Sequence, residues 1–257
     1  MVCSSRLAED SSMNIQETLE KFASFPVASF DTIAPGTSLV LAPHPDDESL
    51  GCGGFMATAV AQGRPPIVVI VSDGSASHPG SRVWPPDRLA RQRQEESIHA
   101  ASLLGLSSDR LIFMGLQDTK VPTEGTAFNS TVDDLCSLLS HHRCENLLVP
   151  WRYDPHCDHE AVWFMGLALK ALNPELRVLA YPVWGLTLPP EMDIPEDVPT
   201  GWHLNVQPCL RQKRQAIKAH RSQRGLVVKD DPDGFVLPDH LLEKMLQPYE
   251  IFIDHEQ

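Results

Sequence analysis

The strongest constraint in this sequence is a cluster of ionisable residues placed directly after a short apolar run. Residues 39–41 read Leu-Val-Leu, and residues 42–48 read Ala-Pro-His-Pro-Asp-Asp-Glu. The pattern recurs downstream, where Leu-Leu-Val at 147–149 is followed by Asp-Pro-His-Cys-Asp-His-Glu at 154–160. Buried charge is costly unless it is paired or bound to a metal, and open α/β sheets carry functional groups at the carboxyl ends of strands. The two clusters therefore predict two strand ends that share one metal site.

The alternation of apolar runs and amphipathic segments predicts the fold class. Short runs rich in β-branched residues and leucine predict buried strands at 38–42, 66–71, 111–114, 147–150 and 178–181. Apolar residues at helical spacing predict helices at 14–24, 56–60, 88–104, 131–140, 160–172 and 208–222. Asp87 is a candidate N-cap and Gly105 a stop signal for the helix at 88–104. This order is typical of an α/β fold with right-handed βαβ units and a mostly parallel sheet.

The other segments carry weaker signals. Residues 73–87 form a loop rich in Ser, Gly and Pro, and residues 185–206 are Pro-rich and irregular. Residues 225–257 mix strand, turn and helix signals, and residues 1–12 are polar. No repeat or linker is evident, so we expect a single domain with loop insertions.

Composition excludes several function classes. The 257 residues include 21 basic and 34 acidic residues, a formal net charge of −13 that disfavours nucleic acid and anionic membranes as partners. The N-terminus lacks the apolar core of a signal peptide, and no run of about 18 apolar residues predicts a membrane-spanning helix. The six cysteines form no C-x-x-C pair and are interpreted as reduced thiols, with Cys157 a bystander. We therefore expect a cytoplasmic protein.

The two clusters contain the residue types of a metal hydrolase. Catalytic zinc commonly takes three His and Asp/Glu ligands and leaves a fourth position for water. His44 and Asp47, three positions apart, could turn inward from one tight loop, and His159 could complete the set. Asp46 is then the natural general base, and His156 could stabilise an oxyanion or protonate the leaving amine.

Three further features of the sequence have both a structural and a functional interpretation or a structural one alone. Arg93 and Glu96 interrupt the apolar face of the helix at 88–104, either as a structural ion pair or with Arg93 facing substrate. Asp118 follows the strand at 111–114 and is either a turn residue or part of the site. His220 lies on one face of the helix at 208–222 and is more typical of a satisfied core or rim residue.

These residues resemble the PIG-L/LmbE-like family of zinc-dependent N-deacetylases. The signature is Pro-His-Pro-Asp-Asp-Glu at 43–48, and the resemblance extends from about 38 to 225 through Ser72-Asp73-Gly74, Arg93-Gln94-Glu95-Glu96, Gly115-Leu116-Gln117-Asp118, His156-Cys157-Asp158-His159 and Ala219-His220-Arg221-Ser222-Gln223. It implies a Rossmann-like fold with helices on both faces and a modified C-terminal part. It also implies metal ligands at His44, Asp47 and His159, a general base at Asp46, an intermediate-stabilising His156 and substrate contacts at Arg93 and Asp118.

The resulting expectation is an N-terminal extension with a short helix at 1–34 and a deacetylase domain at 35–257. The domain would use one zinc ion, or another divalent metal, to remove the acetyl group from an N-acetylglucosamine-type conjugate, which is a small molecule. The sequence leaves open whether the chain forms a homo-oligomer. The long 73–87 loop and Trp184 differ from the simplest family members and indicate a substrate of its own kind. Trp184 is either a sugar-stacking platform or a core residue.

Three alternatives remain at this stage. The chain could be an amidase for a larger thiol or antibiotic conjugate, or a non-catalytic metal-binding or sugar-binding module. The module is disfavoured by Asp46, because ligation alone needs no second carboxylate. A nucleotide-binding Rossmann protein is the weakest alternative, since Gly51, Gly53 and Gly54 have the wrong spacing for a dinucleotide fingerprint and follow an acidic loop.

Overall fold

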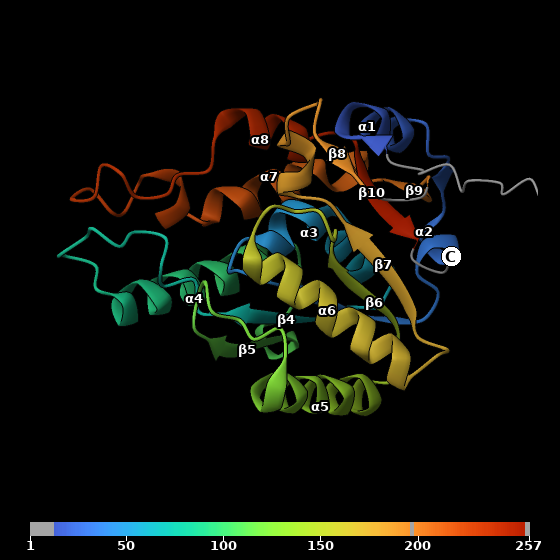
Figure 1. Cartoon of the computed structure of the whole chain (residues 1–257), viewed down its shortest axis with the longest axis horizontal. Helices are drawn as coiled ribbons and strands as arrows, with labels where there is room; N and C mark the ends of the chain where they lie inside the picture. Colours follow the sequence, from blue (N-terminus) through green and yellow to red (C-terminus); the bar gives the residue numbers. More distant parts are fainter. Residues whose placement is uncertain (1–12, 196–197, 255–257) are drawn as a thin grey trace, which may run out of the picture.

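The computed structural model describes residues 13–195 and 198–254, in which an eight-stranded sheet lies between two layers of helices (Figure 1). The sheet order is β2-β9-β10-β7-β6-β3-β4-β5. In chain order these strands are β2 (Val27–Ala28), β3 (Thr37–Ala42), β4 (Ile67–Ser72), β5 (Leu111–Leu116), β6 (Cys144–Pro150), β7 (Arg177–Tyr181), β9 (Thr200–Asn205) and β10 (Tyr249–Asp254). A separate two-stranded ribbon pairs β1 (Met13–Asn14) with β8 (Asp193–Ile194).

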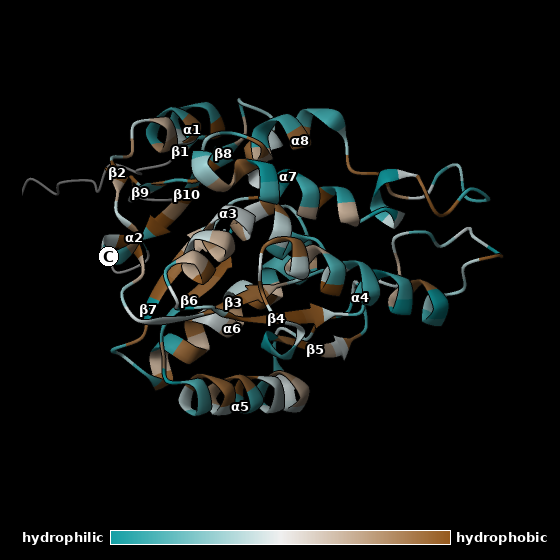
Figure 2. Ribbon diagram, turned by 180° about the vertical axis from the view of Figure 1, so that it is seen from behind, coloured by the Kyte–Doolittle hydropathy of each residue, from teal (hydrophilic) through white to brown (hydrophobic). Residues whose placement is uncertain are grey.

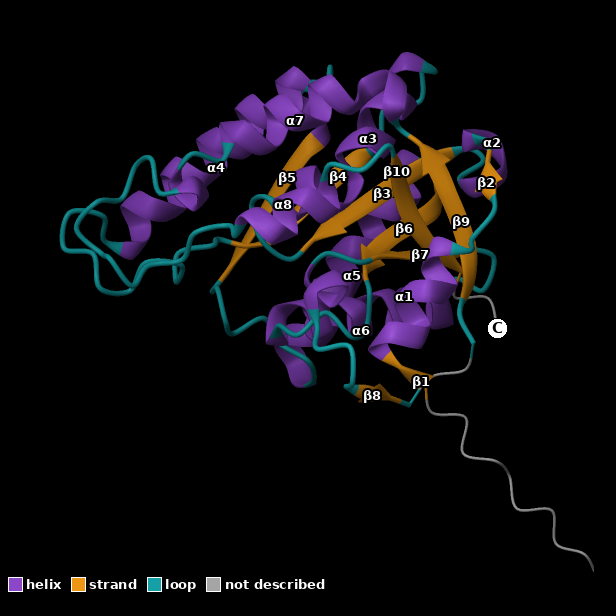
Figure 3. Ribbon diagram, turned by 90° about the horizontal axis from the view of Figure 1, so that it is seen from above, coloured by secondary structure: helices purple, strands orange, loops and turns teal. Residues whose placement is uncertain are grey.

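The helices cover both faces of the sheet, as Figure 3 shows from above. The α-helices are α1 (Ile15–Ala23), α2 (Phe30–Ile33), α3 (Asp47–Ala61), α4 (Pro86–Leu103), α5 (Gly125–His142), α6 (Cys157–Leu172), α7 (Leu210–Ala219) and α8 (Asp239–Met245). Four 3₁₀ turns are η1 (Ser108–Arg110), η2 (Trp184–Thr187), η3 (Gln207–Cys209) and η4 (Ser222–Arg224). Helices α3, α4, α7 and α8 share one apolar core, and α1, α5 and α6 share the other.

The centre of the sheet is parallel, as predicted. Strand β3 pairs in parallel with β4 and β6, and β6 pairs in parallel with β7. These strands are fully covered on both sides, and Figure 2 shows them as a hydrophobic centre. Val40 and Ala42 enter one core while Leu39 and Leu41 enter the other, because successive side chains of a strand point to opposite faces. This burial explains the near-continuous apolar runs in the sequence.

The C-terminal part of the sheet is antiparallel, which is the modification that the family resemblance implied. Strand β10 lies antiparallel between β7 and β9. The expectation of an irregular segment at 185–206 is wrong for residues 200–205, which form β9. This strand has no apolar run and contains Gly201, so the local pattern did not predict it; its ladder with β10 stabilises it instead.

Several predicted helix limits also change. Asp87 is not the N-cap, because α4 begins at Pro86 with Pro85 in the cap position; proline suits a first helical turn, where its missing N–H is no loss. Gly105 ends the helix as predicted, with φ of +81°. Helix α5 begins at 125 rather than 131, and α6 begins at 157 rather than 160. His159 therefore lies in the first turn of a helix rather than at a strand end.

The backbone of helix α3 donates hydrogen bonds to the side chain of Glu250, which lies near the C-terminal end of the described residues. The N–H groups of Gly54 and Phe55 donate to the two carboxylate oxygens of Glu250 at 2.6 and 2.7 Å. A Cβ on Gly54 would collide with Val206 and Glu250, so only glycine lets β10 approach this closely. Lys213 neutralises Glu250 at 2.7 Å, and both side chains are buried. A carboxylate thus inserts into the helical hydrogen-bond ladder.

Four further expectations do not concern single helices or strands. Among the residues that the structure describes, no helix is long and apolar enough to cross a bilayer. The described cysteines are free thiols, which agrees with the reduced state expected for them. The expectations for residues 1–12 lie outside the described residues. The proposed division at 34/35 stays a prediction, although Ile15 and Phe22 of α1 are buried in the core beneath the sheet.

Candidate metal centre

The two ionisable clusters meet at the point where the strand order reverses. From β3 the chain proceeds to β4 and β5 on one side, and then returns to β6 and β7 on the other side of β3. The turn after β3 and the turn after β6 therefore leave the sheet side by side at its carboxyl edge. Such a switch point is where open α/β sheets form ligand sites.

Three side chains from these turns converge on one spot. His44 Nδ1 and His159 Nε2 each lie 3.1 Å from the same oxygen, Asp47 Oδ2. The donor atoms of the three residues all lie within 4.8 Å of one another, and all three residues are buried. His159 Nε2 is buried and has no hydrogen-bond partner despite this approach. The predicted ligand set is thus assembled, with an unpartnered nitrogen aimed at a carboxylate.

Each imidazole contacts a carboxylate through the nitrogen that faces away from Asp47. In the neutral ring, the nitrogen that faces Asp47 then has a free lone pair. His159 Nδ1 lies 3.0 Å from Asp154 Oδ2, so we infer that in the neutral ring Nδ1 carries the proton and Nε2 is unprotonated. His44 Nε2 faces Asp158 Oδ2 at 3.2 Å and Asp118 Oδ1 at 3.3 Å, which assigns its proton to that side and frees Nδ1. Carboxylates that orient ligand histidines in this way are the usual outer shell of a metal site.

The negative charge of the buried carboxylates in this cluster needs a positive charge beside it. Burial alone would lower the pKa of His159, but Asp47 and Asp154 outweigh it and raise that pKa to about 9. Burial would raise the pKa of Asp47, yet the imidazoles of His159 and His44 hold it well below its ordinary value. The buried carboxylates must therefore be balanced by protons on the imidazoles or by a metal ion in their place. A donor set of two imidazoles and one carboxylate suits zinc and several other divalent ions.

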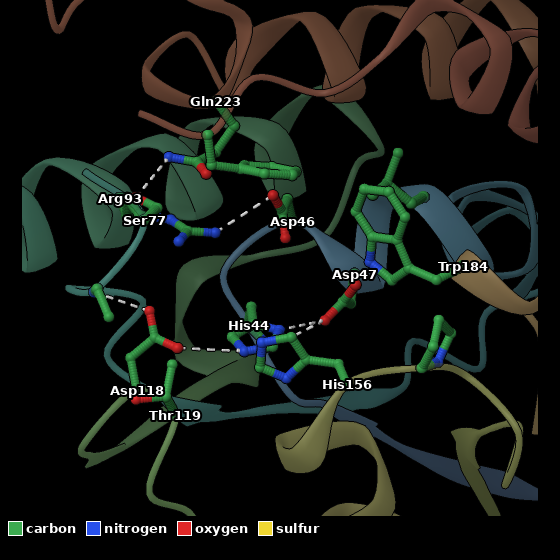
Figure 4. Close-up of a pocket in the computed structure, with 14 residues that line it drawn as sticks. His44, Asp46, Asp47, Ser77, Arg93, Asp118, Thr119, His156, Trp184 and Gln223 are labelled. Carbon is green, nitrogen blue, oxygen red and sulfur yellow. Dashed lines mark hydrogen bonds and ion pairs between the residues drawn. The ribbon is translucent and has the colours of Figure 1, made fainter. Parts of the chain in front are cut away.

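Asp46 points to the same pocket but is held by a different partner. Arg93 Nη2 lies 3.2 Å from Asp46 Oδ2 (Figure 4). The guanidinium also donates to the carbonyls of Gly74 and Pro45. Burial raises the pKa of Asp46 to about 6, and the charge of Arg93 opposes that rise. Of the two interpretations of Arg93 and Glu96, a structural ion pair between them is not observed: Arg93 pairs with Asp46, and Glu96 accepts hydrogen bonds from Ser222.

His156 lines the pocket beside His44, Asp47 and His159, which we call the metal-ligand group because they could hold a metal ion. Its Nδ1 accepts a hydrogen bond from the Asp158 N–H at 3.1 Å, as the N-cap of α6. The neutral ring therefore carries its proton on Nε2. Burial and the neighbouring His44 lower the pKa of His156, which favours this neutral form. The ring packs edge-on against His44 with centroids 4.4 Å apart.

Asp118 is placed in the pocket wall opposite the α3 turn. Its Oδ2 accepts a hydrogen bond from the Ala76 N–H at 2.8 Å, while Oδ1 faces His44. The donor atoms of His44, Asp118 and His156 also lie within 4.8 Å of one another. The next residue, Thr119, has φ of +66° and donates its N–H to Asp158. A β-branched residue with positive φ is strained, and such strain is typical of functional sites.

The sequence missed two parts of this site. Asp154 belongs to the second cluster, but no feature of the sequence indicated that it contacts His159 rather than being another acidic residue of that cluster. It also accepts hydrogen bonds from the N–H groups of Val183, Trp184 and Gly185. Phe235 lines the pocket with no local signal at all. His220 is buried and its Nε2 lies 3.0 Å from Ser49 Oγ, but its Nδ1 has no hydrogen-bond partner among the described residues, so the expectation of a satisfied core residue is met only in part.

The pocket above these residues has a volume of about 380 Å³. Figure 4 shows Arg93, Ser77 and Asp118 on one side of it and Trp184 on the other. Fold and site together define a Rossmann-like α/β protein with a His/Asp group able to hold a metal ion at the carboxyl edge of its sheet.

Comparison with known proteins identifies the family. Residues 39–170 match the family described as PIG-L, GlcNAc-PI de-N-acetylase, and the chain belongs to that family. A curated relative, diacetylchitobiose deacetylase of Thermococcus kodakarensis, is 27% identical over 132 residues, which are 50% of this chain and 47% of the relative. The match therefore spans about half the length of that relative.

Solved structures show the same fold. The N,N′-diacetylchitobiose deacetylase of Pyrococcus horikoshii aligns with a TM-score of 0.64 at 20% identity, covering 86% of this chain and 84% of that one. The zinc-inhibited form of teicoplanin deacetylase Orf2 aligns with a TM-score of 0.61 at 19% identity, covering 84% and 97%. At this identity the likeness is one of fold.

Proposed function

We propose that this chain is a zinc-dependent N-deacetylase that removes acetyl from an N-acetylglucosamine-type conjugate. Family membership and the deacetylase relatives support the reaction class. The single observation that carries the metal requirement is the convergence of His44 Nδ1 and His159 Nε2 on Asp47 Oδ2. These three residues would hold the ion, and a bound divalent cation supplies Lewis acidity that acidifies water and polarises a carbonyl.

The residues around that group have complementary tasks in amide hydrolysis. Asp46 accepts a proton from the attacking water, and Arg93 keeps its carboxylate oriented and charged. His156 donates a hydrogen bond from Nε2 to the oxygen on which negative charge develops. Asp118 lies where it could bind a substrate hydroxyl while it orients His44. The products are acetate and the free amine.

The test is acetate release by the purified full chain, loaded with zinc, from methyl N-acetylglucosaminide and from larger N-acetylglucosamine conjugates. Asp46→Asn should bind zinc with unchanged stoichiometry and lose turnover by about 10²- to 10⁴-fold, the usual contribution of a general base. Asp233→Asn, an isosteric change at an exposed aspartate, is the matched control.

Two outcomes would favour the alternatives. Acyl release confined to large conjugates would favour the amidase for a thiol or antibiotic conjugate. Zinc binding and sugar binding with no release from any substrate would favour a non-catalytic module, and equal turnover by Asp46→Asn would remove Asp46 as the base.

A further inference from the structure

The pocket is lined by two chemically different walls. We group the lining side chains as a polar wall, which includes Ser77, Asp118 and Gln223, and an apolar wall, which includes Leu50, Trp184 and Phe235. Its volume of about 380 Å³ is near the lower end of the range for small-ligand sites, roughly 300–1,000 Å³. A pyranose ring has the same two-sided character, with C–H groups on its faces and hydroxyls around its rim.

The backbone of the turn that carries Trp184 is anchored beside His159. The Trp184 N–H donates to Asp154 Oδ2 at 3.2 Å, and the same oxygen binds His159 Nδ1. The N–H groups of Val183 and Gly185 also donate to this carboxylate. One buried carboxylate therefore orients both a ligand histidine and the turn that carries the aromatic ring. A loosely attached core tryptophan would need no such anchor.

Phe235 is brought to the same wall by a different route. Loops 73–85 and 225–238 project together beyond the body of the molecule and form a structure that we call the arm (Figure 1). The Phe235 N–H donates to the Ser77 carbonyl at 2.8 Å, which fixes the ring between the two loops. Phe235 contacts Trp184 with ring centroids 5.6 Å apart and an interplanar angle of 70°. Both rings are half-buried and leave part of their surface facing the pocket.

The polar wall contains an acceptor that lacks a donor. Gln223 is fully buried and its Nε2 donates to Ser77 Oγ at 3.3 Å and Ser222 Oγ at 3.0 Å. Its Oε1 has no hydrogen-bond partner among the described residues. Buried acceptors are rarely left unpaired in folded proteins. A hydroxyl group of a bound ligand would supply the missing donor.

We propose that Trp184 and Phe235 form a subsite for the C–H face of the substrate's pyranose ring, and that Gln223 accepts a hydrogen bond from a ring hydroxyl. The proposal rests on the deacetylase function above and deepens it. The subsite selects acetamides carried by a sugar ring over acyclic acetamides. It acts by binding the ring, so it affects KM rather than the chemical step.

Trp184→Ala tests the subsite, since the substitution keeps the backbone N–H that Asp154 binds. In the zinc-loaded chain we expect KM for methyl N-acetylglucosaminide to rise about tenfold while kcat stays within a few-fold. Trp184→Phe should restore most of the affinity, and KM for acyclic N-acetylethanolamine should not change. Phe235→Ala should show a smaller rise, with Phe164→Ala on the exposed side of α6 as its control.

A second measurement separates this inference from the proposed function. Calorimetry of methyl N-acetylglucosaminide binding to the metal-free chain should show the same weakening in Trp184→Ala, without any turnover. Gln223→Met, which keeps the length but removes the acceptor, should weaken binding a few-fold. If the wild type released no acetate but the binding loss persisted, the deacetylase proposal would fail and the subsite would stand.

Equal sugar affinity in the wild type and Trp184→Ala would overturn the subsite and leave the deacetylase proposal intact. If Trp184→Ala did not fold, as judged by its unfolding transition, Trp184→Phe and Phe235→Ala would decide the matter. Wild-type affinity in both of them would overturn the subsite.

Discussion

The floor of the pocket and its rim are built by opposite strategies. The floor consists of His44, Asp46, Asp47, His156 and His159, which lie between the end of β3 and the first turn of α3 and between the end of β6 and the first turn of α6. The rim consists of Trp184, Phe235 and the arm. In the floor, buried carboxylates orient His44 and His159 at about 3 Å, whereas the arm is joined by hydrogen bonds at exposed positions such as Asp230. Under the proposed function, the rigid floor would perform the chemistry and the more adaptable rim would select the substrate.

The largest effect should follow from removing a floor ligand. We expect His159→Gln to weaken zinc binding by more than about 100-fold, beyond the loss usually caused by an outer-shell substitution, and to bring acetate release to the background. Metal analysis after dialysis and an acetate assay would measure both. His99→Gln, at an exposed position on α4, should change neither. A variant that kept full zinc content would remove His159 from the ligand set.

The second-largest effect should follow from substituting Asp154, whose carboxylate binds residues of both the floor and the rim. Asp154→Asn keeps the shape but loses the charge that orients His159 and the η2 turn. Zinc affinity should fall by about 10- to 100-fold, and KM for methyl N-acetylglucosaminide should rise as well. Competition with a chelator and steady-state kinetics would measure the two effects. A change in zinc affinity alone would show that the rim does not depend on Asp154.

The floor should also make the metal-free chain sensitive to pH. The pKa of His159 is raised from its ordinary value of 6.5 to about 9, so its protonated form stabilises the folded state. That contribution is complete below about pH 6.5 and is lost as the pH rises through 9. Denaturant unfolding of the metal-free chain should therefore show falling stability over this range.

Two controls make the pH prediction specific. His159→Gln should show a shallower decline, and zinc-loaded protein should not show it, because the ion replaces the proton. A decline of equal steepness in wild type and variant would place its origin elsewhere in the molecule.

The smallest effect should come from loosening the arm. The carboxylate of Asp230 accepts hydrogen bonds from Ser81 Oγ and from the N–H groups of Arg82 and Val83. We expect Asp230→Ala to raise KM a few-fold, because Phe235 loses its fixed position, while kcat stays unchanged. Asp233→Ala removes the same charge from the same loop and should behave as the wild type. A fall in kcat with unchanged KM would contradict a rim confined to binding.

The sequence alone could predict the floor because its information is local. His44, Asp46 and Asp47 lie within four positions, directly after a strand whose burial on both faces makes its pattern unambiguous. The turn after β6 also shows ionisable residues after an apolar run. Since the carboxyl ends of parallel strands lie at one edge of the sheet, the two turns could be predicted to meet. Arg93 was predicted to contact substrate, and its observed bonds to Asp46 and Pro45 depend on how α4 packs; its role stays a prediction.

The rim could not be predicted because it depends on pairs of distant segments. Phe235 reaches the pocket only because its N–H bonds to Ser77, 158 positions earlier in the chain. Strand β9 likewise depends on β10, and its six residues carry no strand pattern of their own. In both cases tertiary pairing outweighs local propensity.

The insertion of Glu250 into α3 has a consequence for how activity is acquired during folding. The bond from Gly54 to Glu250 joins residues 196 positions apart, so the helix that begins with Asp47 is locked only after a contact of long sequence separation has formed. Contacts of this kind are costly in chain entropy and form late. The candidate metal site should therefore form after the parallel strands have assembled. A refolding chain should regain its secondary structure before it regains tight zinc binding.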